Sequence, residues 1–138
     1  MTTEINKAKM YRFVEFINTA DERLSKELIS EDAIFYAPTS PDPIKGPAGY
    51  ISIIELMRTG FPDVQWLLEE MVAEGNTVAA RFVLEGTHQG VFFGIAPTGK
   101  KIKVQALNFY YFLNGKIIKE YGQPDLLGLL HQIGATSV

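Results

Sequence analysis

Apolar residues in the first half of the chain recur at helical spacing. Between residues 4 and 19 they return every three or four positions with charged residues between them, which predicts an amphipathic helix. Asp21 suits the N-cap of a second, shorter helix. A third helix is expected from Gly46-Pro47, because proline fits the first helical turn. A short strand at 33–36 lies between the second and third helices and is followed by three prolines.

From Pro62 onward the pattern changes to extended runs. They predict strands at 64–73, 77–86, 101–112 and 116–123. Gly75-Asn76 and Asn114-Gly115 are turn signals between consecutive strands. A last helix at 126–133 ends at Gly134, a residue type that commonly follows a helix.

This order of elements predicts the α+β fold class, with helices first and a mostly antiparallel sheet after them. Helices laid against one strongly bent sheet leave space between the two layers, so we expect a pocket there. Glycines at 86, 90, 94 and 99 offer places where the sheet could bend. A chain of 138 residues, of which 46% are apolar, suits a single domain over 1–138 with its own core.

Charge and cysteine content narrow the function classes. Thirteen Lys and Arg against sixteen Asp and Glu leave a formal charge of −3, so no basic surface is expected for nucleic acid. The absence of cysteine removes disulfides and thiolate chemistry, and it fits a reducing compartment. No apolar run approaches the roughly 20 residues of a membrane span, and two distant histidines form no metal motif. We therefore expect a cytoplasmic protein without nucleic acid, membrane or metal among its partners.

A glycine-rich run and the C-terminal segment resemble one protein family. The run Gly86–Lys100 reads GTHQGVFFGIAPTGK, and the segment Asp125–Gly134 reads DLLGLLHQIG. Together with Phe61-Pro62-Asp63 and Asn114–Ile118, in the same order, they are similar to the SnoaL-like polyketide cyclase family of the nuclear transport factor 2-like superfamily. The resemblance implies a cone-shaped, cystatin-like fold, in which a curved, mostly antiparallel sheet wraps around N-terminal helices and leaves a pocket between the layers.

The resemblance also implies an activity. It is an aldol-type ring closure on a polyketide ester, in which a pocket carboxylate removes a proton alpha to a carbonyl and polar neighbours stabilise the enolate. No metal or organic cofactor is needed, and the ligand is a small, largely apolar carbonyl compound. The carboxylate must lie in a water-poor cavity, where its pKa rises and makes it a better base.

Glu120 is the carboxylate that we expect to face the pocket. A hairpin with a three-residue loop at 113–115 pairs Asn108 with Glu120 and places both, with Tyr110, on one face of the sheet. The related ketosteroid isomerases carry an oxyanion-binding acid where Asn108 stands, which favours the concave face and a substrate-binding role. A two-residue loop would instead pair Asn108 with Tyr121 and turn the second strand over. The structural alternative for Glu120 is an exposed strand residue paired with a lysine such as Lys119 or Lys103.

Gly122 departs from the family pattern. The resemblance implies a Trp-Asp pair, found in many family members, at the two positions where this chain has Tyr121-Gly122. The acid/base aspartate of the cyclases then falls on the position of Gly122. Either Glu120 has taken over that role, or the protein is not a working aldol cyclase. Two further catalytic candidates have structural alternatives. Asp125 is either an acid at the site or a helix cap, and His88 either shuttles a proton or fixes the glycine-rich loop.

Aromatic residues supply further candidates for substrate binding. Aromatic stripes at helix or strand spacing are core residues more often than ligand walls, so both roles stay open for them. The candidates are Tyr11, Phe13, Tyr36, Trp66, Phe82, Phe93 and Tyr110.

Two function classes follow from these observations. The first is a cofactor-independent enzyme of the cyclase or isomerase type that works by acid/base chemistry in the pocket. The alternative is a non-catalytic domain of the same fold for ligand binding or dimerisation, or a hydrolase on this fold. On the preferred register, the convex sheet face carries Leu107, Phe109 and Tyr111, and three large apolar groups on an exposed sheet predict a homodimer.

Overall fold

The computed structural model describes residues 2–135 and contains all the predicted helices and strands. The helices are α1 (Thr2–Thr19), α2 (Glu22–Leu28), α3 (Gly46–Gly60) and α4 (Leu126–Gln132). The strands are β1 (Ile29–Tyr36), β2 (Ile44–Lys45), β3 (Gln65–Glu74), β4 (Thr77–Thr87), β5 (Lys101–Leu113) and β6 (Lys116–Pro124). None of the described helices is long and apolar enough to cross a membrane.

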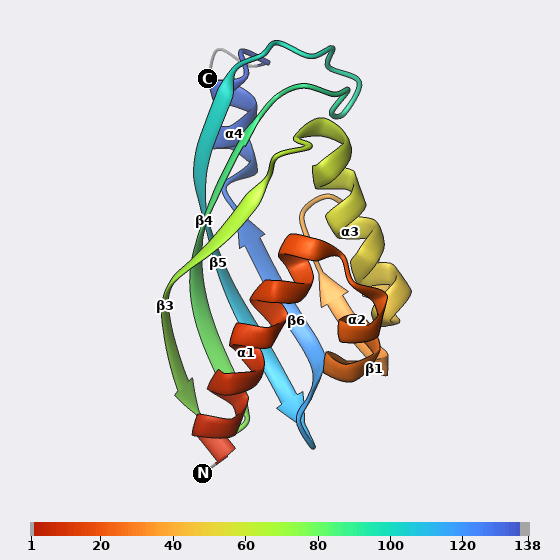
Figure 1. Ribbon diagram of the computed structural model, residues 1–138, viewed down its shortest axis with the longest axis vertical. Coiled ribbons are helices and arrows are strands. Elements are labelled where there is room, and N and C mark those ends of the chain that lie inside the picture. The colour runs from red at the N-terminus through yellow and green to blue at the C-terminus, as the bar shows by residue number, and fades with distance from the viewer. Residues whose placement is uncertain (1, 136–138) are drawn as a thin grey trace.

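The strands form one curved, mixed sheet, and α1, α2 and α3 lie on one side of it (Figure 1). Their order is β2-β1-β6-β5-β4-β3, and all neighbours are antiparallel except β1 and β6, which run parallel. α1 packs on β3, α3 packs on β1, and α2 lies between these two helices. This arrangement confirms the α+β class.

β1 starts four residues before the predicted strand at 33–36. Ile29 already pairs with Ile117 of β6, although the ladder is irregular between Ile29 and Ile34. Residues 30–32 are polar and exposed or half-buried, so the apolar pattern does not reveal this part of the strand. The strand therefore begins where a distant partner strand is available, not where its own hydrophobic run starts.

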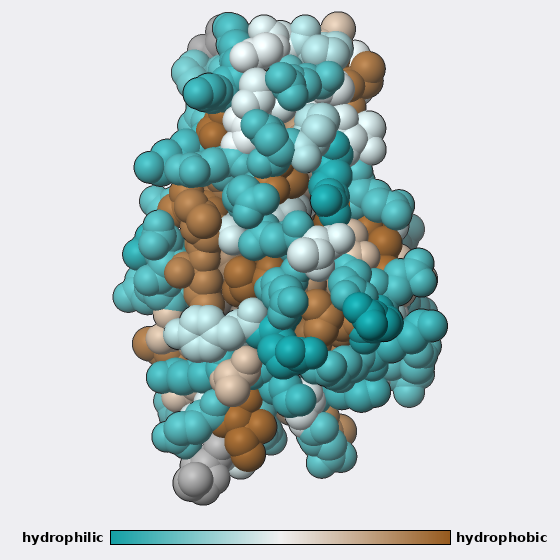
Figure 2. Space-filling view, in the orientation of Figure 1, coloured by the Kyte–Doolittle hydropathy of each residue, from teal (hydrophilic) through white to brown (hydrophobic). Residues whose placement is uncertain are grey.

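Each helix turns its apolar stripe toward the sheet. In α1, Met10, Phe13 and Phe16 are fully buried, whereas Tyr11 is 64% exposed. Figure 2 shows mainly hydrophilic groups over the visible face, with hydrophobic ones in separate patches. The predicted cap of α2 is confirmed, because Asp21 Oδ1 accepts a hydrogen bond of 2.8 Å from the Arg23 backbone N–H.

The turn between β5 and β6 differs from the expected three-residue loop. Asn114 and Gly115 form a two-residue loop with Leu113 opposite Lys116, and both loop residues have positive φ, 51° and 79°. Asn-Gly favours this kind of turn because both residue types tolerate a left-handed backbone. The prediction of a loop at 113–115 is therefore wrong.

The shorter loop alone would turn the side chains of β6 to the opposite face of the sheet, but a β-bulge at Ile118 turns them back. Ile118 has no partner on β5, so one extra residue enters β6 and the pairing beyond it is Tyr110 with Glu120 and Asn108 with Gly122. The predicted pairing of Asn108 with Glu120 is wrong by two residues. A shift of two keeps the side of the sheet, so Glu120 still faces inward and is 5% exposed.

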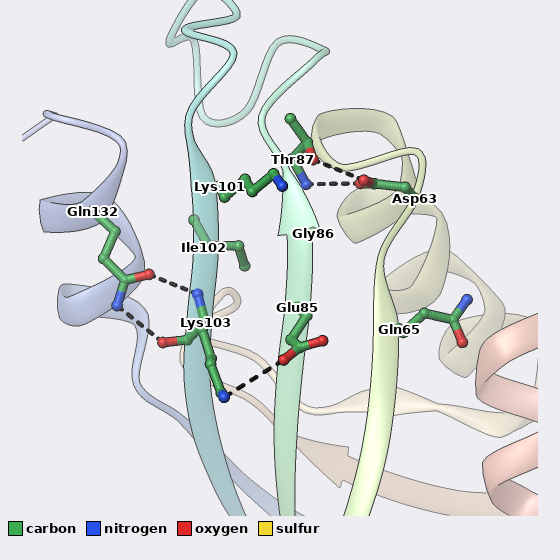
Figure 3. A pocket seen from close by; sticks show the side chains of 9 residues that line it. All are labelled: Asp63, Gln65, Glu85, Gly86, Thr87, Lys101, Ile102, Lys103 and Gln132. Carbon is green, nitrogen blue, oxygen red and sulfur yellow. Dashed lines mark hydrogen bonds and ion pairs between the residues drawn. The ribbon is translucent and has the colours of Figure 1, made fainter.

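α4 closes the end of the sheet where β6 stops. The part of β5 that precedes Ala106 has no partner in β6, and there the Asp125 N–H donates to the Gln105 carbonyl instead. The Gln132 side chain accepts from the Lys103 N–H at 2.7 Å and donates to the Lys103 carbonyl at 3.0 Å (Figure 3). One amide side chain thus replaces the missing strand and ties α4 to β5.

Candidate active site

A small cavity lies between the inner face of the sheet and α3. Its volume is about 90 Å³. Its wall is mainly apolar, with Ile53, Leu56 and Met57 from α3 opposite Trp66 and Leu84 from the sheet. The segment after β1, which includes Pro38 and Thr39, and the half-exposed Tyr36 also line it. This cavity lies between the two layers, and it is narrow.

Glu120 brings an acidic group into this cavity. It is the only carboxylate among the described residues that line the cavity, and its Oε1 atom is buried without a hydrogen-bond partner. Burial raises the pKa of Glu120 from the ordinary 4.5 to about 8, because the charged form loses its water. An interaction with the Tyr50 hydroxyl acts in the opposite direction and lowers this pKa.

Two buried tyrosines surround the carboxyl group. Burial, and then the negative charge of Glu120, raise the pKa values of Tyr50 and Tyr110 well above the ordinary 10. Both phenols therefore keep their protons and remain hydrogen-bond donors at neutral pH. Phe13 packs against both rings, with centroid distances of 5.2 Å to Tyr50 and 5.3 Å to Tyr110.

Asn108 is held in place from two sides. Its Nδ2 atom donates to the Tyr110 hydroxyl at 3.0 Å, and its Oδ1 atom accepts from the Gln123 backbone N–H at 3.0 Å. These bonds fix which end of the amide points toward each partner. One N–H of the Asn108 amide is left over, because the amide carries two donors and only one is used.

Five of the predicted site residues come together here. Glu120, Asn108, Tyr36 and Trp66 line the cavity, and Tyr110 adjoins it through Asn108. Their shared location agrees with the sequence analysis, while their chemical roles stay predictions.

Four predicted aromatic residues lie elsewhere. Tyr11 is on the solvent side of α1, because Met10 and Phe13 hold the buried side of that helix, and Phe93 is 48% exposed in the loop after β4. Phe13 and Phe82 are fully buried in the core and do not line the cavity. The prediction that these four bind substrate is therefore not supported.

His88 and Asp125 have structural contacts outside the cavity. His88 Nδ1 accepts from the Thr98 N–H at 3.2 Å and lies 3.0 Å from the Thr98 hydroxyl, so it joins the two ends of the loop that reaches over α3 (Figure 1). Asp125 is exposed, and its Oδ1 caps α4 by accepting from the Gly128 N–H at 2.8 Å. Neither lines the cavity with Glu120. Their contacts are those of the structural roles considered above, a helix cap for Asp125 and fixation of the glycine-rich loop for His88.

Tyr50 is the site residue that the sequence analysis missed as a candidate. It lies on the buried face of α3, where its ring packs at 4.7 Å from that of Phe35. A tyrosine on the apolar stripe of a predicted helix is a usable signal, since a buried hydroxyl needs a polar partner. The pattern shows that Tyr50 is buried, but only the folded chain shows that its partner is Glu120.

A second, open hollow of about 690 Å³ lies on the outer side of the sheet (Figure 3). Three of its four charged side chains, Asp63, Glu85 and Lys103, already have partners. Asp63 accepts two hydrogen bonds from Thr87, and Lys103 lies 3.7 Å from Glu85. Within residues 2–135, no group of three or more His, Asp or Glu is arranged to hold a metal ion. Glu120 in the inner cavity is thus the better candidate for chemistry.

Comparisons with known sequences agree with this architecture. The profile of a family described as SnoaL-like polyketide cyclase matches residues 8–133. Aklanonic acid methyl ester cyclase DnrD of Streptomyces peucetius is 26% identical over 140 residues, covering 97% of this chain and 92% of the relative. Nogalonic acid methyl ester cyclase of Streptomyces nogalater is 30% identical over 90 residues, covering 64% of this chain and 67% of the relative.

Solved structures give the same fold. IdmH of Streptomyces antibioticus, a proposed polyketide cyclase, has a TM-score of 0.84 at 28% identity and covers 94% of this chain and 98% of its own. AclR of Streptomyces galilaeus, a proposed hydroxylase, has a TM-score of 0.84 at 26% identity, with 99% and 89% coverage. Because these two neighbours carry different proposed activities, the activity of this chain has to be argued from its own cavity.

Proposed function

Because the chain belongs to the SnoaL-like polyketide cyclase family, we propose that it closes a ring in a polyketide ester by an aldol reaction with Glu120 as the base. The relatives named as methyl ester cyclases support the substrate class. Glu120 supports the chemistry, because it is the one carboxylate found among the described cavity-lining residues. The absence of an acid at Gly122 then does not remove catalysis, since an acid two residues earlier faces the same cavity.

The observation that carries this proposal is the burial of Glu120 in a mainly apolar cavity. A base with a pKa of about 8 holds a proton more strongly than an ordinary carboxylate, and a fraction of it is still ionised near neutral pH. This combination suits the removal of a proton from a carbon next to a carbonyl group.

The reaction needs no further reactant. The Glu120 carboxylate takes a proton from the carbon alpha to a carbonyl, and the electron pair of the broken C–H bond forms the enolate. The enolate carbon then attacks a second carbonyl carbon of the same molecule, which forms the C–C bond of the new ring. The resulting alkoxide takes the proton back from Glu120, so the product is an isomer of the substrate and the base is restored.

Two neighbours can stabilise the negative charge that develops on the enolate oxygen. Tyr50 has one O–H, which interacts with the Glu120 carboxylate and becomes available as a donor once Glu120 has taken the proton, and Asn108 has an unused N–H donor; both residues line the cavity beside Glu120. In a water-poor cavity such donors act more strongly than in solution. We assign the enolate oxygen to this side of the cavity.

The size of the cavity bears on how the substrate binds. About 90 Å³ is well below the roughly 300–1,000 Å³ of pockets that enclose a drug-sized ligand. The reactive end of the substrate therefore enters the cavity, and the remainder lies against Tyr36, Pro38 and Thr39 at the surface.

The proposal includes a homodimer in a reducing cytoplasm. Val72, Leu107 and Phe109 are 63%, 60% and 51% exposed on the outer face of the sheet, and an exposed apolar sheet face favours a second copy of the chain. The lack of cysteine fits the cytoplasm.

Turnover of two defined esters tests the proposed function. The purified protein is incubated with aklanonic acid methyl ester and with nogalonic acid methyl ester. The products are separated by chromatography, and their masses are determined by mass spectrometry. We expect a product of unchanged mass with one additional ring, its formation abolished by Glu120→Gln and retained by Glu69→Gln, which neutralises an exposed glutamate on β3. An inactive wild-type protein, or an active Glu120→Gln variant, would refute the proposal.

A further inference from the structure

Trp66 lies on β3, which is an edge strand because the strand order of the sheet ends with it. On one side Trp66 pairs with Leu84 of β4, and on the other side the sheet offers it no strand. Backbone N–H and C=O groups on such an edge need partners from elsewhere. The partners of Trp66 therefore come from outside the sheet.

The side chain of Asn18 supplies both partners. Its Oδ1 atom accepts from the Trp66 backbone N–H at 2.9 Å, and its Nδ2 atom donates to the Trp66 carbonyl at 3.0 Å. Asn18 lies in the last turn of α1, the helix that packs on β3. We call this pair of part-buried bonds the amide clamp, because one amide takes the place of a neighbouring strand.

The stretch of β3 that carries Trp66 is short and bounded at both ends. Before it, the Val64 N–H closes a turn on the Phe61 carbonyl at 2.9 Å. After it, the pairing with β4 shifts between Leu68 and Glu70, so a β-bulge separates this stretch from the rest of the strand. The amide clamp thus ties a short, separate stretch of the edge strand to the helix layer.

Trp66 is the largest side chain that the sheet contributes to the wall of the small cavity. It lies opposite apolar side chains of α3, and Glu120 lines the same cavity. Because the volume is only about 90 Å³, a small displacement of the Trp66 ring changes the space that a ligand can enter. The placement of this ring therefore bears directly on how a substrate approaches the carboxyl group.

We propose that Asn18 is a positioning residue, which holds Trp66 through the amide clamp and so sets how the reactive end of the substrate lies against Glu120. This inference rests on the proposed function. Asn18 itself does not line the cavity, so it acts through Trp66.

Steady-state kinetics test this role, and Gln132 offers a matched control. The Gln132 amide makes the same pair of bonds to Lys103, at 2.7 and 3.0 Å, away from the cavity. With aklanonic acid methyl ester as the probe, we expect Asn18→Ala to lower kcat/KM roughly 10- to 100-fold, because a slightly misplaced positioning group slows the reaction strongly. Gln132→Ala should keep kcat/KM near the wild-type value. A folded Asn18→Ala variant with wild-type kcat/KM overturns the proposal, while loss of activity in Glu120→Gln would still uphold the proposed function.

Fluorescence supplies a readout that a general loss of stability would not move. Trp66 is the single tryptophan of the chain, so its emission reports on the cavity wall alone. Under conditions where all variants are folded, we expect acrylamide to quench Trp66 more strongly in Asn18→Ala than in the wild type. Gln132→Ala should be quenched like the wild type. Equal quenching in all three proteins overturns the proposal.

Amide hydrogen exchange in the wild-type protein gives a measurement that does not depend on the folding of a variant. We expect the Trp66 N–H to exchange slowly, as the Lys103 N–H does, because each donates to a side-chain amide. Exchange of the Trp66 N–H at the rate of an unprotected backbone amide overturns the amide clamp. A wild-type protein that converts neither ester refutes the proposed function and, with it, the positioning role of Asn18.

Discussion

Replacing Glu120 by Gln removes a group whose protonation is strongly linked to folding. The pKa of Glu120 is about 8 in the folded protein because of burial, against 4.5 for an ordinary glutamate. The folded state therefore holds the proton more tightly than the unfolded state. The stability that this provides is complete below about pH 4.5, falls as the pH rises, and is lost above about pH 8.

The size of the effect follows from the two pKa values. One pKa unit corresponds to about 1.4 kcal/mol, so the difference between 4.5 and about 8 amounts to about 5 kcal/mol. Between about pH 5 and pH 9 the wild type should lose about 4 kcal/mol that Glu120→Gln does not lose. The neutral amide has nearly the same shape as the carboxyl group and does not titrate.

Urea unfolding at several pH values measures this difference. The free energies of unfolding of the wild type and of Glu120→Gln are compared at each pH, so the contributions of all other titrating groups cancel. Glu69→Gln is the matched control, because it removes an exposed carboxylate of the same type. We expect the stability of Glu120→Gln relative to the wild type to rise with pH and that of Glu69→Gln to stay constant. A constant difference for Glu120→Gln would show that Glu120 is hydrated in solution.

Three further predictions concern activity, assembly and the last helix. The value of kcat/KM should rise with pH and level off above about pH 8, because the base must be ionised; a steady fall over this range in a pH–rate profile would contradict the role of Glu120. Phe109→Asp should convert a dimer into a monomer of 15.4 kDa in sedimentation experiments, and a monomeric wild type would contradict the proposed dimer. Asp125→Ala should lower the free energy of unfolding by about 1 kcal/mol through loss of the α4 cap, with turnover near that of the wild type; strongly reduced turnover would make Asp125 a catalytic candidate again.

The pairing of β5 with β6 shows why part of the site could be anticipated and part could not. Alternation along the strands predicts that Asn108, Tyr110 and Glu120 share a face, and all three do point inward. Their partners were predicted two residues out of place, because the bulge at Ile118 leaves no clear mark in the alternation. Pairing errors of an even number of residues preserve the face, so the inward position of Glu120 was predicted although its neighbour was not.

The aromatic residues show a second limit of the same kind. Trp66 and Phe82 both sit at inward positions of neighbouring strands, yet Trp66 lines the cavity and Phe82 is enclosed in the core. Their own strands do not distinguish them, because the depth of a side chain depends on where the helices cross the sheet. Tyr50 is a partner of Glu120 for the same reason, since α3 and β6 are brought together only by packing.

Local sequence by itself determined the helices and main strands, the cap at Asp21 and the left-handed turn at Gly134, because these depend on residues a few positions apart. Tertiary structure alone decided that Glu120 loses its water, that Tyr50 lies beside it, and that Gly122 leaves room next to its carboxyl group. Burial and close approach are properties of segments far apart in the chain, and they appear only when the helix layer closes over the curved sheet.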